Sequence, residues 1–136
     1  MTPPLKGLST TPKTVAARLG LKAGMDVFVL LPPPDVVALI GPLPVDSHVK
    51  EKSDRPCAVV LLFARNSNEL VRWLPGASPA VAAGGKLWVA FYKKASGMDS
   101  DINRDLVREH ALTLGMEPIA ILSIDGQWSA LRLKQM

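Results

Sequence analysis

Cysteine occurs only once in this chain of 136 residues, as Cys57. A single cysteine cannot form an intramolecular disulfide, and this one begins a strongly apolar segment. Small secreted domains often depend on disulfides, whereas the cytoplasm keeps thiols reduced. We therefore expect a cytoplasmic protein whose stability comes from a packed core.

Long apolar runs are also absent. Runs such as Val27–Leu31 and Cys57–Ala64 fall far short of the roughly 20 residues that a membrane-spanning helix needs. The first 24 residues contain no apolar stretch that could serve as a signal peptide. The sequence thus predicts a soluble protein with no membrane partner.

Aromatic residues make up only 5% of the chain, and the formal net charge is a mild +4. Proteins that bind nucleic acids usually carry a stripe of basic residues, often with aromatic side chains for base stacking. Here the basic residues are scattered, and only Lys93–Lys94 and Arg132–Lys134 form local concentrations. This pattern is more typical of a solvated surface. Nucleic acid therefore ranks last among the partners we consider.

What the chain does contain is an alternation of strand-like and helix-like segments. Residues 1–10 are rich in Pro, Gly, Ser and Thr and predict a loose N-terminal arm, and residues 11–136 predict a single α/β domain. Apolar runs predict strands at 27–31, 57–64, 86–92, 117–124 and 128–134. Cap signals predict helices that begin near Thr11, Asp35, Asn66 or Ser67, and Asp99 or Ser100. A further turn is expected at Ser78-Pro79, ended by Gly84-Gly85, and the polar segment 44–56 is expected to be a surface loop.

This order predicts a small Rossmann-like sheet of about five strands in two or three layers. Most strands would be parallel, and a hairpin around Asp125-Gly126 would add an antiparallel end. The segments Cys57–Ala64 and Leu87–Tyr92 are apolar almost throughout, so both faces of the sheet must be covered. Crossovers that always step in one direction would place their helices on a single face. The N-terminal helix, the arm or a second subunit would cover the other face, and we favour a homodimer.

Four motifs of the chain carry a resemblance to known proteins: Leu19–Gly24, Gly84–Val89, Lys93–Gly97 and Ile124–Arg132. They resemble a short bacterial family catalogued only as a domain of unknown function, and the resemblance covers most of the chain. The chain is also distantly similar to the C-terminal half of class I methyltransferases. That likeness implies the strand order 1-2-3-5-4, in which the last strand is inserted beside the third. It concerns the fold and does not imply an activity.

The turn after the first predicted strand argues against a nucleotide or S-adenosylmethionine cofactor. Such sites normally need glycines there, because backbone N–H groups must approach the ligand. This chain has Pro32-Pro33-Pro34 instead, and proline has no N–H to offer. No acidic residue follows the second predicted strand, where Arg65-Asn66 stand, and the predicted order has no reversal between parallel strands. We therefore expect no cofactor.

The loop after the third predicted strand is the best candidate for a ligand site. Lys93, Lys94 and Ser96 lie there, at the carboxyl end of the strand where α/β proteins place ligands. Their ammonium and hydroxyl groups could hold a phosphate or carboxylate, and Arg65 at the end of the neighbouring strand could join them. A solvated loop whose lysines confer solubility is the alternative.

Two apolar residues are candidates for contact with a partner. Trp128 begins the last predicted strand and would be either a binding platform or a core residue. Leu112 projects from the polar side of its helix. The histidines and the cysteine lack metal-ligand spacing, and the chain has no carboxylate pair or nucleophile motif with a convincing spacing. We predict no metal site and no catalytic residue.

The sequence therefore predicts a non-catalytic binding domain of the bacterial cytoplasm. Its partner would be a small anion at Arg65, Lys93, Lys94 and Ser96, or a protein, which includes its own copy. The first alternative is an enzyme of unrecognised type, a degenerate methyltransferase-like protein that uses the same loop. The second alternative is a weak nucleic-acid binder.

Overall fold

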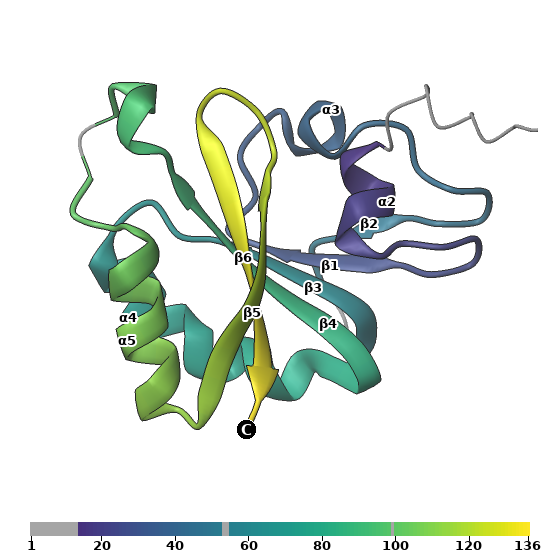
Figure 1. The fold of residues 1–136 in the computed structure, drawn as a ribbon. Helices are drawn as coiled ribbons and strands as arrows, with labels where there is room; N and C mark the ends of the chain where they lie inside the picture. The colour runs from purple at the N-terminus through teal and green to yellow at the C-terminus, as the bar shows by residue number, and fades with distance from the viewer. Residues whose placement is uncertain (1–13, 53–54, 99) are drawn as a thin grey trace, which may run out of the picture.

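The structure is a computed structural model, which describes residues 14–52, 55–98 and 100–136. The expected N-terminal arm and the helix start expected at Thr11 lie outside the described residues, as does Asp99. Figure 1 shows the arrangement of the elements around a central sheet.

The sheet has six strands: β1 (Val27–Leu30), β2 (Val49–Lys50), β3 (Cys57–Phe63), β4 (Val81–Tyr92), β5 (Met116–Ser123) and β6 (Trp128–Gln135). Their order is β2-β1-β3-β4-β6-β5. The first four strands of that order are parallel, and β6 is antiparallel to both β4 and β5. The predicted class is therefore confirmed, with the last strand inserted beside the third predicted one. One strand is added.

The added strand is β2, which lies in the segment 44–56 that was expected to be a loop. Its two residues pair with the first two residues of β1. Asp26, just before β1, holds the pairing together, since its carboxylate accepts the His48 N–H at 3.0 Å and lies 3.3 Å from Lys50 Nζ. Such a short polar segment has no alternation of apolar and polar residues from which a strand could be predicted. Only its pairing with β1 makes it a strand.

The helices are α2 (Val15–Leu19), α3 (Val36–Ile40), α4 (Ser67–Ala77) and α5 (Arg104–Thr113), with 3₁₀ turns η2 (Ser78–Ala80) and η3 (Lys94–Ser96). Asn66 caps α4 as predicted, because its side chain accepts the Glu69 N–H. The expected cap of α5 is corrected. Asn103 takes that position and accepts the Leu106 N–H, so the segment from Ser100 to Ile102 belongs to the preceding loop.

β4 also begins earlier than expected, at Val81 rather than Lys86. Cys57 pairs with Val81, but Val59 pairs with Lys86, so the segment 82–85 bulges out of the sheet. Gly84 has a φ of +75°, and a Cβ on Gly85 would lie 2.7 Å from the Ala58 carbonyl oxygen. The glycine pair therefore shapes a bulge inside a strand and does not end a helical turn.

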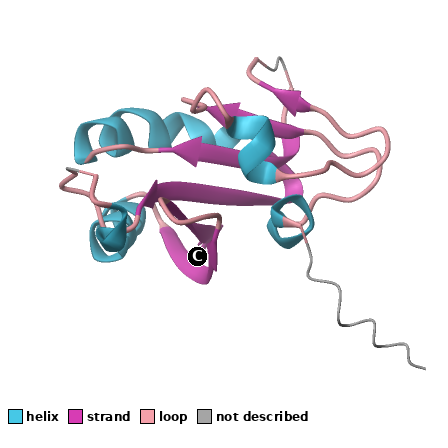
Figure 2. Ribbon diagram, turned by 90° about the horizontal axis from the view of Figure 1, so that it is seen from above, coloured by secondary structure: helices cyan, strands magenta, loops and turns pink. Residues whose placement is uncertain are grey.

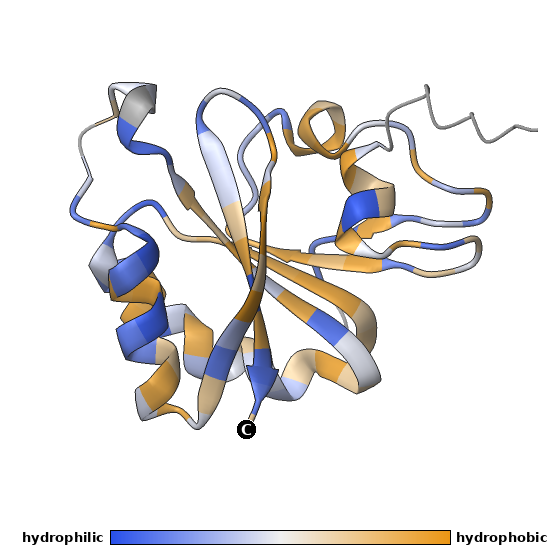
Figure 3. Ribbon diagram, in the orientation of Figure 1, coloured by the Kyte–Doolittle hydropathy of each residue, from blue (hydrophilic) through white to orange (hydrophobic). Residues whose placement is uncertain are grey.

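Helices lie on both sides of the sheet (Figure 2). Along β3, Val59, Leu61 and Phe63 belong to one apolar core with α2 and α3. The intervening residues, Val60 and Leu62, belong to a second core with α4 and α5. The central strands are accordingly the most apolar part of the ribbon (Figure 3). The expectation that both faces are covered is confirmed.

The cover of both faces has a topological cause. The chain steps outward from β1 to β2 and then returns across β1 to β3. Because βαβ crossovers share one hand, this reversal puts α3 and α4 on opposite faces. The N-terminal helix, one of the three covers expected for the other face, is confirmed there as α2, and α3 covers that face with it. An uncovered face of the sheet was the reason to expect a homodimer, and that reason no longer applies. The homodimer stays a prediction.

Candidate functional site

A hollow of about 620 Å³ lies at the carboxyl end of β4. Its lining comes from the end of β4 and the loop after it, from the start of α5, and from one residue on each hairpin strand: Phe91, Tyr92, Lys93, Lys94, Met98, Ser100, Asp101, Ile102, Asn103, Arg104, Asp105, Ile121 and Ser129. Its two lysines were predicted from the sequence. Most of the other lining residues were not, because they lie in segments that only the fold brings together, although the Asn103 cap was a readable helix-start signal.

The lysine loop is held in place by the turn of the β5–β6 hairpin. The backbone N–H of Lys93 donates a hydrogen bond of 2.7 Å to the Gln127 carbonyl oxygen. The Lys93 ammonium donates to the hydroxyl of Ser123, on the last residue of β5. Lys94 is exposed and has no such bond among the described residues. One ammonium of the pair is therefore anchored, and the other is free to meet a ligand.

The two acidic residues of the lining, Asp101 and Asp105, differ in their hydrogen bonding. Asp101 accepts hydrogen bonds from the Ser67 hydroxyl and, at 2.8 Å, from the Ser67 backbone N–H. These bonds hold the pKa of Asp101 below its ordinary value, so the carboxylate remains ionised and occupied. Asp105 lies in the first turn of α5, where a negative charge is favourable. The lining thus holds three cations, Lys93, Lys94 and Arg104. It also holds two carboxylates: Asp101, which is hydrogen-bonded to Ser67, and Asp105.

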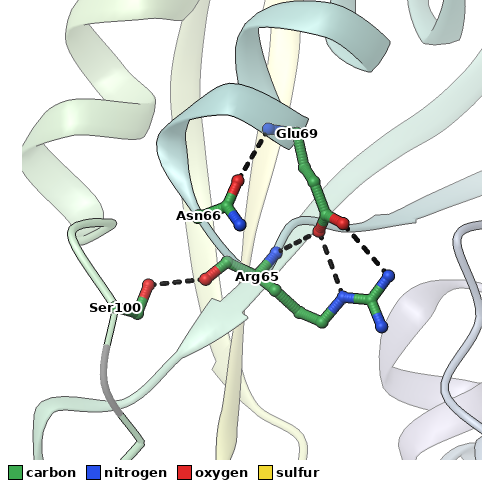
Figure 4. A network of polar contacts seen from close by, with 4 residues as sticks. All are labelled: Arg65, Asn66, Glu69 and Ser100. Carbon is green, nitrogen blue, oxygen red and sulfur yellow. Dashed lines mark hydrogen bonds and ion pairs between the residues drawn. The ribbon is translucent and has the colours of Figure 1, made fainter.

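Arg65 is not part of this lining, because its guanidinium turns to Glu69 (Figure 4). Its Nε lies 3.2 Å from Glu69 Oε1 and its Nη2 lies 3.0 Å from Oε2, while its backbone N–H donates to Oε1 at 2.8 Å. Hydrogen bonding to Glu69 raises the pKa of Arg65. Burial alone would raise the pKa of Glu69, but the bonds from Arg65 outweigh it and lower that pKa. The charge of Arg65 is therefore already neutralised by Glu69, in the first turn of α4.

The spacing Asn66-x-x-Glu69 is a sequence signal for this arrangement. A cap residue followed three positions later by glutamate often returns the glutamate side chain toward the start of the helix. The Arg65 carbonyl, moreover, accepts a hydrogen bond of 2.6 Å from the Ser100 hydroxyl (Figure 4).

Ser96, the fourth predicted residue, also lies outside the lining, and its hydroxyl accepts the Met98 N–H at 3.1 Å. Of the four residues, the hollow brings together Lys93 and Lys94.

The two residues predicted for partner contact lie in different surroundings. Trp128 is a core residue with 3% of its surface exposed. Its ring stacks on Tyr92 at a centroid distance of 4.2 Å and meets the edge of Phe63 at 5.0 Å. It therefore supports the wall of the hollow from inside, through Tyr92. Leu112 is 39% exposed on α5 and remains available to a partner.

The carboxyl ends of β1 and β3 form a second place where a ligand could bind. We expected no reversal between parallel strands, and the position of β2 outside β1 overturns that expectation. An acidic residue, Glu51, directly follows β2. The proline turn after β1 remains as predicted, and the preceding Leu31 has a φ of +55°. These strand ends have the topology of a cofactor site but lack the glycines that such a site normally has after its first strand.

Among the described residues, no three His, Cys, Asp or Glu side chains lie close enough together to hold a metal ion. None of the helices in that part of the chain has the length and apolar character that crossing a bilayer requires.

Solved structures with this arrangement of strands and helices define the fold class. A ribosomal protein L11 methylase from Lactobacillus delbrueckii subsp. bulgaricus matches with a TM-score of 0.58 and 10% identity, over 89% of this chain and 74% of that one. A TehB-like SAM-dependent methyltransferase from Corynebacterium glutamicum matches with a TM-score of 0.54 and 14% identity, over 96% and 92%. DhpI in complex with SAH gives 0.56 and 11%, over 96% and 85%. The fold is methyltransferase-like.

The family follows from the sequence itself. Residues 34–136 match the model of the family described as "Protein of unknown function (DUF3052)". Because the match spans most of the chain, this protein belongs to that family. The curated proteins contain no significant match.

Proposed function

We propose that this protein is a non-catalytic binding domain on a methyltransferase-like scaffold, and that it binds an anionic group, a phosphate or carboxylate, in the hollow at the carboxyl end of β4. The observation that carries the proposal is the convergence of Lys93 and Lys94 with the N-terminus of α5 on one hollow. Carboxyl ends of strands are where open α/β sheets bind ligands.

The electrostatics of the hollow favour an anion. The first backbone N–H groups of a helix have no partner inside it and carry partial positive charge. α5 directs this end to the hollow, and Asn103 accepts only the Leu106 N–H. The free ammonium of Lys94 adds a full charge beside it. A phosphate or carboxylate would replace water on both groups.

Ligand-induced thermal stabilisation tests the proposal. We expect orthophosphate or acetate to raise the melting temperature of the wild type, because a ligand that binds only the folded state stabilises it. The double variant Lys93→Ala/Lys94→Ala should lose most of that increase. The matched control Lys22→Ala/Lys134→Ala removes the same charge from two exposed lysines outside the hollow and should retain it. If neither anion stabilises the wild type, or if the double variant responds equally, the proposal is wrong.

A second candidate is an adenosyl-cofactor binder, which corresponds to the enzyme of unrecognised type that the sequence left open. The strand reversal at β1 and the position of Glu51 after β2 favour it. Pro32-Pro33-Pro34 argues against it, because the turn offers no N–H to a ligand. Calorimetric titration with S-adenosylmethionine distinguishes the candidates. We expect no binding heat, and tight stoichiometric binding would replace our proposal with the second candidate.

A further inference from the structure

The hollow continues into a second one along the outer strand of the sheet. A space of about 430 Å³ lies between α5 and β5, lined by Arg104, Asp105, Arg108, Pro118, Ile119, Ala120, Ile121 and Leu131. Arg104, Asp105 and Ile121 line both spaces. The two therefore form one continuous depression, which we name the α5–β5 groove. Figure 1 shows α5 and β5 diverging from the turn that joins them.

The groove has an exposed apolar lining. Ile119 is 44% exposed, Ile121 is 51% exposed, and Met98 at the far end is 43% exposed. Single exposed apolar residues are ordinary on protein surfaces. Three that line one continuous groove are a feature typical of interaction sites.

The groove carries more cations than carboxylates, because its lining holds Lys93, Lys94, Arg104 and Arg108 against Asp101 and Asp105. Arg104 and Arg108 lie one helical turn apart on α5, and neither has an ion pair or hydrogen bond within the described part of the chain. Lys94 stands at the other end of the groove, also unpaired there. Leu112 lies one turn beyond Arg108 on the same stripe of α5 and extends the apolar surface. An occupant must therefore offer apolar side chains together with carboxylates.

Two other occupants fit the groove less well. A strand added along the whole edge of β5 would need a regular row of backbone groups, but Pro118 lacks an N–H, and the pairing register shifts between Pro118 and Ala120. A second copy of this chain would bring the same cations to a symmetric contact. A partner of opposite charge that docks through its side chains needs no regular pairing with the β5 backbone and brings no like charges to the contact.

We propose that the α5–β5 groove docks an acidic, apolar segment of a partner protein. Its apolar side chains lie on Ile119 and Ile121, and its carboxylates meet Arg104, Arg108 and Lys94. The inference rests on the proposed function in one respect, namely that the anion bound beside the lysines is a carboxylate of this segment. The contacts along Arg108 and Ile119 are independent of the lysine hollow.

Selection from a phage-displayed library of random peptides against the full chain tests this inference. We expect the enriched peptides to combine Asp or Glu with Leu, Ile or Phe. Affinities of the selected peptides should fall by about tenfold or more for Arg108→Glu and for Ile121→Ser, as for central contacts in an interface. Arg72→Glu and Val71→Ser on α4 are matched controls, since both residues are exposed and lie outside the groove, and they should leave the affinity unchanged.

The remaining outcomes overturn the inference. They are an absence of enrichment, enrichment of peptides without acidic residues, binding that the groove variants do not change, or a dimer in sedimentation velocity that Ile121→Ser converts to a monomer. The last outcome would make a second copy the occupant. The comparison of small anions with peptides separates this inference from the proposed function: if small anions fail to stabilise the wild type while peptides still bind through Arg108 and Ile121, only the proposed function fails.

Discussion

The contact between Glu69 and Arg65 shows how one side chain can withdraw another from a predicted site. Arg65 was expected among the anion-binding residues, but the glutamate one helical turn later holds both its guanidinium and its backbone N–H. An arginine paired in this way cannot meet a ligand without giving up its partner. The lysines, which have no acidic residue at that spacing, stay in the candidate site.

This contact should make part of the stability depend on pH. The pKa of Glu69 is lowered in the folded protein from its ordinary value of 4.5. Its stabilising effect is therefore present above pH 4.5 and is lost as the pH falls through the lowered value. We expect Glu69→Gln to cost roughly 0.5–1 kcal/mol of unfolding free energy near neutral pH, since Arg65 is partly exposed. Urea unfolding should give no difference in strongly acid solution. A difference that persists there would contradict the assignment.

Two glycines should respond in opposite ways to the same substitution. A Cβ on Gly85 would lie 2.7 Å from a backbone oxygen, whereas a Cβ on Gly76, inside α4, would meet nothing within 4 Å. We expect Gly85→Ala to destabilise the protein by roughly 1–3 kcal/mol through overpacking of the bulge. Gly76→Ala should stabilise it by about 0.5–1 kcal/mol, because alanine has the better helix propensity. Equal melting temperatures for the two variants would mean that the bulge is wrongly described.

At the scale of elements, the beginnings of the helices decide which residues reach the site. α5 was expected to begin at Asp99 or Ser100, but it begins after Asn103. Both readings obey cap preferences, because Asp, Ser and Asn are all good cap residues. The choice among them depends on where the helix meets the sheet. As a result, Ser100 and Ile102 line the hollow and do not lie within the helix.

The cap of α5 should be worth more than the corresponding residue of α3. Asn103 accepts the Leu106 N–H at 2.8 Å, whereas the side chain of Asp35 at the start of α3 makes no capping bond. Asn103→Ala should therefore lower the unfolding free energy by about 1 kcal/mol, and Asp35→Ala should change it by less than about 0.5 kcal/mol. Chemical denaturation of the two variants measures the difference. A larger loss for Asp35→Ala would contradict the prediction that the Asn103 cap contributes more to stability than Asp35.

At the scale of the whole molecule, the order of the strands sets where stability lies. β3 is paired on both sides, and its residues alternate between the two cores. β2 has two residues, which pair only with β1. We expect the β3 amides to exchange their hydrogens only when the whole protein unfolds, and the β2 amides to exchange by local opening. Hydrogen-exchange NMR with increasing denaturant measures both. Equal protection of the two strands would contradict this hierarchy.

The same strand order changes the argument about cofactors. From five strands, no reversal was visible, and the helices were expected on one face. β2 restores the reversal, and with it the helices on both faces and an acidic residue, Glu51, after the strand. The proline turn after β1 is then the main local feature that distinguishes these strand ends from a cofactor site with glycines. The question of a cofactor therefore depends on one turn, which calorimetry can test directly.

The sequence by itself determined the elements whose signals are local. Apolar runs such as Cys57–Ala64, the turn at Asp125-Gly126 and the cap at Asn66 act through neighbouring residues, so strand, hairpin and helix could be read from them. Only the tertiary structure decided the strand β2, the burial of Trp128, the pairing of Arg65 with Glu69 and the groove between α5 and β5. These depend on which of several locally acceptable partners the fold brings within contact distance. That choice is a property of the packed whole and is not encoded in any one segment.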